Sequence, residues 1–207
     1  LMGLPVAGRA ARLAPADLME EVDFHLLGTP QPVADPKRVE VIEFFYYGCR
    51  WCNEFQSHLD RWLQNKPADV QFRYQPAIRN TRWIVLTKAF YALQQMQQLG
   101  RLHQSLYQAF HRDNVNLEDQ AVLTAWLLKH GVELKPFETL MQSDEIMAKV
   151  QAAREMTIAY DVQSTPSVVV DGRYLTNSGL TGGVGRLMEV VEALIAQARV
   201  DRRTPPR

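Results

Sequence analysis

Cysteine is scarce in this sequence: the 207-residue chain contains only two, at positions 49 and 52. A structural disulfide between such close neighbours would remove little entropy from the unfolded chain, because the ring that it closes is small. A zinc site is also disfavoured, since zinc takes about four ligands and none of the five histidines has a paired spacing near the cysteines. We therefore expect neither a metal nor another cofactor. Two buried thiols without any function remain an alternative.

Net charge and long apolar runs are absent as well. Lysine plus arginine and aspartate plus glutamate both number 23, so no basic field favours nucleic acid or anionic lipid. No stretch approaches the roughly 18 uninterrupted apolar residues of a membrane span. With 46% hydrophobic and 22% charged residues, the chain is an ordinary globular one that is long enough for a core with an inserted subdomain.

The first half of the chain alternates strand and helix. The stretch "RVEVIEFFYY" (38–47) is apolar and β-branched on both faces, which predicts a central strand covered on both sides. Apolar residues at 55, 59, 62 and 63 then follow a helical spacing, and residues 70–74 alternate as a second strand.

The second half is helical before it returns to strand. From about residue 81 to 160 every apolar stripe has helical spacing, with one helix closing at Gly131 and another beginning near Ser143. Strand character returns at "SVVVDGRYL" (167–175), where Asp171-Gly172 predicts a two-residue hairpin turn. A closing amphipathic helix covers 187–195. The pattern predicts an α/β domain with a helical insertion.

The two cysteines lie where the first strand turns into the first helix. Free backbone N–H groups and the helix dipole at such a turn stabilise thiolate over thiol. The dipole contributes about 0.3 to 1 kcal/mol, so a shift of more than about one pKa unit requires hydrogen bonds to the sulfur. Cys49, nearer the turn, is then the attacking thiolate and Cys52 the resolving thiol, as in C-x-x-C thiol–disulfide exchange.

The stretches "VIEFFYYGCRWCNEF" (41–55) and "STPSVVVDGRY" (164–174), with a helical block between them, resemble the DsbA-type thiol:disulfide oxidoreductases of the bacterial envelope. The resemblance covers about residues 20 to 198 and implies a thioredoxin-like fold with an inserted helical domain. Residues 20–76 and 161–200 would form the thioredoxin-like domain and 77–160 the insertion. We expect residues 1–19 to be a disordered arm or leader remnant and 201–207 a disordered tail.

The resemblance also assigns roles around the cysteines. It implies that Cys49 is the nucleophile and Cys52 the resolving cysteine, and that Thr165 precedes a cis-proline, Pro166, beside them at a substrate-binding loop. From the base rate alone a trans bond at Pro166 is favoured.

The dipeptide between the cysteines departs from the family. Arg50 and Trp51 stand where typical members have proline and histidine, so we expect them to tune the redox properties, with a Cys49 pKa below the free-thiol value but less depressed than in those members. Exposed Trp51, together with the aromatic residues at 45–47, would form an apolar surface for unfolded chains.

Glu43 is an acid within the apolar first strand. If it is buried, its pKa rises toward neutrality and it can relay a proton to or from Cys52, and the family has an acid at this place. The alternative is that Glu43 is a structural carboxylate in an ion pair with Arg73. Arginine cannot act as a proton donor, so Arg73 would affect the site only as a fixed positive charge.

We therefore predict a protein disulfide oxidoreductase that donates its Cys49–Cys52 disulfide to reduced secreted proteins. A reductase or isomerase of the same fold is the first alternative, and a redox-silent peptide- or glutathione-binding module, as in kappa-class glutathione transferases, is the second. The resemblance implies a periplasmic monomer that binds no nucleic acid and is reoxidised by a membrane quinone reductase of the DsbB type.

Overall fold

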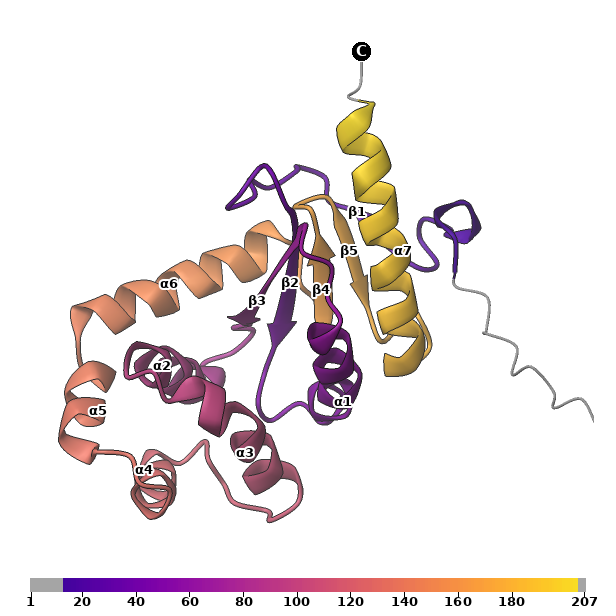
Figure 1. Ribbon diagram of the computed structural model, residues 1–207. Coiled ribbons are helices and arrows are strands. Elements are labelled where there is room, and N and C mark those ends of the chain that lie inside the picture. The colour runs from indigo at the N-terminus through magenta and orange to yellow at the C-terminus, as the bar shows by residue number, and fades with distance from the viewer. Residues whose placement is uncertain (1–12, 205–207) are drawn as a thin grey trace, which may run out of the picture.

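The computed structural model describes residues 13–204; the disorder expected for residues 1–12 and 205–207 lies outside this range. Its centre is one five-stranded sheet with the order β1-β5-β4-β2-β3 (Figure 1). β2 and β3 are parallel, and every other neighbouring pair is antiparallel. The strands are β1 (His25–Leu26), β2 (Val39–Phe45), β3 (Val70–Pro76), β4 (Ser167–Val170) and β5 (Tyr174–Asn177).

β2 is an inner strand, between β4 and β3, and all seven of its residues are buried, as predicted for a strand covered on both sides. One face packs against α1 (Arg50–Gln64) and α7 (Val184–Arg203), which lie together on one side of the sheet in Figure 1. The other face, with Ile42 and Phe44, packs against the C-terminal end of α6 (Asp144–Ala159) and the residues that follow it. Coverage on both sides explains why β2 is a continuous apolar run.

Between β3 and β4 the chain is helical, as the spacing predicted. In addition to α6, the block contains α2 (Trp83–Gln95), α3 (Leu99–His111), α4 (Gln120–Lys129) and α5 (Leu134–Met141). The apolar stripes of α2 to α5 form one core cluster, which includes Phe45, Tyr47 and Cys52, whereas the stripe of α6 belongs to a second cluster. The helical block therefore packs directly against the end of β2 where the cysteines lie.

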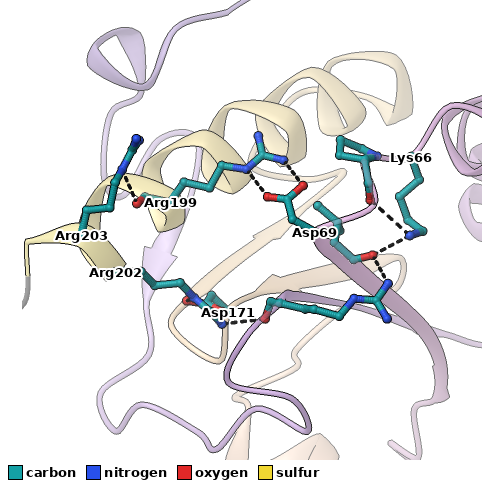
Figure 2. A network of polar contacts seen from close by, with 9 residues as sticks. Lys66, Asp69, Asp171, Arg199, Arg202 and Arg203 are labelled. Atoms are coloured by element: carbon teal, nitrogen blue, oxygen red, sulfur yellow. Dashed lines mark hydrogen bonds and ion pairs between the residues drawn. The ribbon is translucent and has the colours of Figure 1, made fainter.

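The opposite end of β2 is held by ion pairs from α7 (Figure 2). Arg199 donates to both carboxylate oxygens of Asp69 at 2.7 and 2.8 Å, and Arg202 binds both oxygens of Asp171. Arg202 also donates to the backbone carbonyl groups of Pro36 and Arg38. Residues 201–203 are thus the last part of α7, and the prediction of a disordered tail from residue 201 is wrong there.

Two other predicted boundaries also need correction. Residues 13–19 contain a short 3₁₀ helix, η1 (Pro15–Asp17), and Leu13 and Leu18 pack against the core cluster of α7, so this part of the expected arm is ordered. The hairpin turn is one residue longer than predicted, because Val170 pairs with Tyr174 and leaves three residues between the strands.

Within residues 13–204, no helix is long and apolar enough to cross a membrane.

Candidate active site

Cys49 is the N-cap of α1 and follows the end of β2 after three residues. Its Sγ accepts a hydrogen bond from the backbone N–H of Cys52 at 3.3 Å, and its thiol donates to the backbone carbonyl of Thr165 at 3.1 Å. The preceding residue has to be glycine, because a Cβ at Gly48 would lie 2.5 Å from a ring carbon of Tyr46. Both cysteines are free, with Cys49 partly exposed and Cys52 fully buried.

Hydrogen bonds lower the pKa of the Cys49 thiol to about 6, mainly through the side chain of Cys52. Burial opposes this shift, while the Thr165 side chain and the backbone N–H groups of Cys52 and Trp51 reinforce it. Hydrogen bonds to sulfur therefore dominate, as expected from the small contribution of a helix dipole. At neutral pH Cys49 is mostly a thiolate.

The pKa of Cys52 moves in the opposite direction. Burial raises it well above the ordinary thiol value, and the negative charges of Cys49 and Glu43 raise it further. One thiol of the pair is thus ionised and accessible, and the other is neutral and enclosed. This asymmetry makes Cys49 the sulfur that can attack or be attacked from solvent.

Glu43 is fully buried on the face of β2 that points toward α1. Burial raises the pKa of this carboxyl to about 8, with smaller contributions from Cys49 and Asp60. The side-chain amide of Gln56, from α1, opposes the shift by donating to both carboxyl oxygens at 3.3 and 3.4 Å. Glu43 is therefore mostly protonated at neutral pH, and its charge, when it ionises, acts on the buried sulfur of Cys52.

Arg73 does not pair with Glu43, so that alternative is wrong. In the parallel register Arg73 lies beside Ile42, and its side chain is therefore on the other face of the sheet. There it meets Glu40, with 3.3 Å between Arg73 Nε and Glu40 Oε1. Arg73 was predicted to tune the site as a positive charge next to Glu43. Its side chain instead pairs with Glu40 on the opposite face of the sheet.

Thr165 and Pro166 lie beside Cys49, where the sequence placed them, and the peptide bond between them is cis, as the resemblance predicted. Pro166 directly precedes β4. Their position leaves Cys49 between the first turn of α1 and this loop.

Of the aromatic residues near the cysteines, only Trp51 is exposed, at 50% of its surface. The predicted apolar patch is wrong for residues 45–47, since all three are buried. Tyr46 stacks on Trp83 with ring centroids 4.1 Å apart, and its hydroxyl donates to Glu118 of the helical block. Arg50 extends along the helix to Glu54 at 2.9 Å and lies over the Trp51 ring.

Sequence reasoning missed Gln56, which is the polar partner of Glu43. The sequence did contain a signal for Gln56, because it lies four residues after Cys52, on the buried side of an otherwise apolar helix stripe.

Among the described residues no group of three or more histidine, cysteine or acidic side chains could hold a metal ion.

A redox-capable C-x-x-C opens the helix that follows a buried strand, and its first cysteine faces a cis-proline loop. On a thioredoxin-like sheet with inserted helices, this arrangement defines a thiol:disulfide oxidoreductase. Residues 40–194 match the family model described as DSBA-like thioredoxin domain. The chain belongs to this family.

Curated relatives and solved structures agree with the assignment. The chain is 31% identical to the thiol:disulfide interchange protein DsbA of Azotobacter vinelandii over 191 residues, covering 92% of this chain and 89% of that protein. It is 30% identical to DsbA of Pseudomonas aeruginosa over 84% of this chain and 82% of that protein. A crystal structure of Pseudomonas aeruginosa DsbA superposes with a TM-score of 0.85 at 28% identity, covering 91% of this chain and 98% of that one.

Proposed function

We propose that the protein oxidises pairs of thiols in reduced secreted proteins by donating a Cys49–Cys52 disulfide through a mixed disulfide at Cys49. The observation that carries the proposal is the opposite protonation of the two sulfurs, with the pKa of Cys49 at about 6 and that of buried Cys52 well above the usual value. Only Cys49 is accessible, so a substrate sulfur attacks there.

The reaction consists of two exchanges at sulfur. A substrate thiolate attacks Cys49 Sγ, a new S–S bond forms, and the Cys49–Cys52 bond breaks with its electron pair going to Cys52. A second substrate thiolate then attacks the first substrate sulfur, and Cys49 leaves as a thiolate. The substrate is oxidised by two electrons to a disulfide and the enzyme is reduced to its dithiol form. The low pKa of Cys49 makes it a good leaving group in the second step.

Glu43 supplies the proton that the first exchange requires. Cys52 departs as a thiolate in a buried site that disfavours its charge, whereas Glu43, with a pKa of about 8, still holds a proton at neutral pH. Transfer of this proton neutralises the Cys52 sulfur. During reoxidation the carboxylate takes the proton back. Glu43 thus acts as a catalytic acid and base.

Thr165 and Pro166 hold the substrate next to Cys49. An extended peptide lying along this loop would pair with the Thr165 backbone and bring its cysteine to the partly exposed Sγ. Exposed Trp51, two residues after Cys49, offers apolar contact to an unfolded chain.

We assign the protein to the periplasm as a monomer. Its relatives carry the name thiol:disulfide interchange protein and come from bacteria such as Azotobacter vinelandii and Pseudomonas aeruginosa. The reduced enzyme needs an electron acceptor, for which a DsbB-type membrane quinone reductase is the class of partner. Reduced secreted proteins are the substrates.

The reduction potential tests the direction of exchange. Equilibration with glutathione buffers, followed by the change in tryptophan fluorescence, should give a potential clearly more oxidising than the roughly −270 mV of thioredoxin. A value as reducing as that of thioredoxin would contradict the oxidase and favour the reductase.

The same measurement on variants of Trp51 tests the effect of the dipeptide between the cysteines. Trp51→His introduces a cation beside the Cys49 thiolate and should move the potential further toward oxidation, by roughly 30 mV for a tenfold change in equilibrium constant. Trp51→Asn, which is polar but neutral, is the matched control. An equal shift in both variants would show that charge is not the cause.

A further inference from the structure

The amide of Gln56 is arranged in an unusual way for a fully buried side chain. Its Nε2 donates to both carboxyl oxygens of Glu43, at 3.3 and 3.4 Å. Its Oε1 is buried and, among residues 13–204, has no hydrogen-bond partner. An unsatisfied buried acceptor is costly, and a glutamine that served packing alone would not require one.

Glu43 in turn depends on this amide. Within the described chain it takes part in no ion pair, since the nearest arginine on the neighbouring strand lies on the other face and binds Glu40. The titratable groups whose charges interact with Glu43 come from the segment between β2 and α1, from β3, from α1 and from α3, and none of them is cationic. They are Tyr47, Cys49, Tyr74, Cys52, Asp60 and Tyr107. The charged form of Glu43 is therefore stabilised mainly by Gln56.

We propose that Gln56 is a positioning residue for proton transfer at Glu43, because its amide can hydrogen-bond the carboxyl group in both protonation states. When Glu43 is charged, Nε2 donates to the carboxylate, as in the structure. When Glu43 is protonated, its O–H can donate to Oε1 while Nε2 still donates to the other oxygen. The atom without a partner is the one that the neutral acid needs.

The position of Gln56 suits this task. It lies on α1 one turn after Cys52 and one turn before Asp60, and all three are on the same side of the helix. Proton exchange between Glu43 and Cys52 thus takes place next to a neutral side chain that does not itself titrate. An arginine or lysine here would favour the charged form of Glu43, and an apolar residue would favour its neutral form.

The proposal rests on the role of Glu43 as proton donor and acceptor, and it makes a separate prediction about the carboxyl group itself. Hydrogen bonds to a charged acceptor are roughly twice as strong as those between neutral groups. Loss of the amide therefore costs the carboxylate more than the neutral acid. The pKa of Glu43 should rise above its value of about 8 when Gln56 is replaced by an apolar residue.

The test uses Gln56→Met, whose unbranched side chain fits the same space, with Gln64→Met as the matched control on the exposed end of the same helix. We expect ¹³C NMR titration of the Glu43 carboxyl to show an upward pKa shift of about one unit or more in Gln56→Met and none in the control. The pH profile of thiol–disulfide exchange should shift in the same direction. An unchanged or lowered pKa of Glu43 in Gln56→Met would overturn the proposal.

A second measurement does not depend on Gln56→Met. In the wild-type protein the side-chain amide resonances of Gln56 should titrate with the same midpoint as the Glu43 carboxyl, and this titration should vanish in Glu43→Gln. Amide resonances that do not change across that midpoint would also overturn the proposal. A third outcome separates this proposal from the proposed function. If the Glu43 pKa shifts in Gln56→Met but Glu43→Gln has the wild-type pH profile of exchange, Gln56 does control the protonation of Glu43. The proton-relay role of Glu43 is then wrong.

Discussion

Strand β2 carries two buried glutamates, three residues apart, in opposite surroundings. Glu40 faces Arg73 across the sheet, with 3.3 Å between Oε1 and Nε. Glu43, on the other face, meets only the neutral amide of Gln56. Burying a carboxylate without a cation is expensive, and the sheet avoids this cost at Glu40 but not at Glu43. An uncompensated acid can change its protonation state near neutral pH, whereas an ion-paired one serves stability.

The same contrast separates the two ends of the strand. At the end remote from the cysteines, α7 neutralises Asp69 and Asp171 with Arg199 and Arg202 (Figure 2). At the cysteine end, burial and hydrogen bonds determine which of Cys49, Cys52 and Glu43 is charged. The molecule thus pairs its charges at one end of the strand and keeps titratable groups without a cationic partner at the end where we propose that protons and disulfides are exchanged.

The largest expected effect contrasts the two sulfurs. In the reduced protein at pH 6.5, alkylation should label Cys49 at least about 1000-fold faster than Cys52, because only Cys49 is accessible and ionised. The rate at Cys49 should level off above pH 7 and fall about tenfold per pH unit below its pKa of about 6. Mass spectrometry of quenched samples measures both rates, and urea-unfolded protein is the control. Equal labelling in the folded protein would remove the distinction between nucleophile and resolving thiol.

The next effect concerns Glu43. Glu43→Gln should slow oxidation of a dithiol peptide about 10- to 100-fold, because positioned proton transfer typically contributes at least this much. The pH dependence of the rate should also change. Glu40→Gln is the matched control, since it makes the same chemical substitution on the other face of the same strand and should leave the rate per folded molecule unaltered. Wild-type pH dependence in Glu43→Gln would return Glu43 to a structural role.

A smaller effect is expected on stability when Glu40, like Glu43, is left without a cation. Arg73→Met leaves Glu40 buried without its cation and should lower the free energy of unfolding by roughly 1 to 3 kcal/mol, less than for a fully buried pair because Arg73 is one-third exposed. Urea titration measures the loss, which Glu40→Gln in the same chain should partly restore. If Arg73→Met slowed exchange as much as Glu43→Gln, Arg73 would belong to the redox machinery after all.

Much of this arrangement could be predicted from the sequence. The apolar run before Cys49, the change to helical spacing after it and the helical block before "SVVVDGRYL" determine the layout of the sheet and the insertion. The same reasoning placed Cys49 at a helix N-terminus and Glu43 on a strand covered on both sides, because both statements depend only on local periodicity.

The errors came from contacts between distant segments. Arg73 follows the alternation of its own strand, but its partner depends on the register between β2 and β3, and a difference of one residue exchanges the two faces. The basic C-terminal residues resembled a solvated tail because Asp171, the partner of Arg202, is 31 residues away in sequence. Gln56 could be placed on the buried side of α1, whereas its unsatisfied Oε1 emerges only from the three-dimensional packing.

The central claim is that Glu43 is a protonated, uncompensated acid beside the buried sulfur in the working pH range. Site-resolved ¹³C NMR of the Glu43 carboxyl in the reduced protein tests it most directly, with assignment by its absence in Glu43→Gln. We predict a midpoint of about 8. A midpoint near the ordinary glutamate value of about 4.3 would contradict the account, because Glu43 would then be fully ionised at neutral pH and have no proton to give to Cys52.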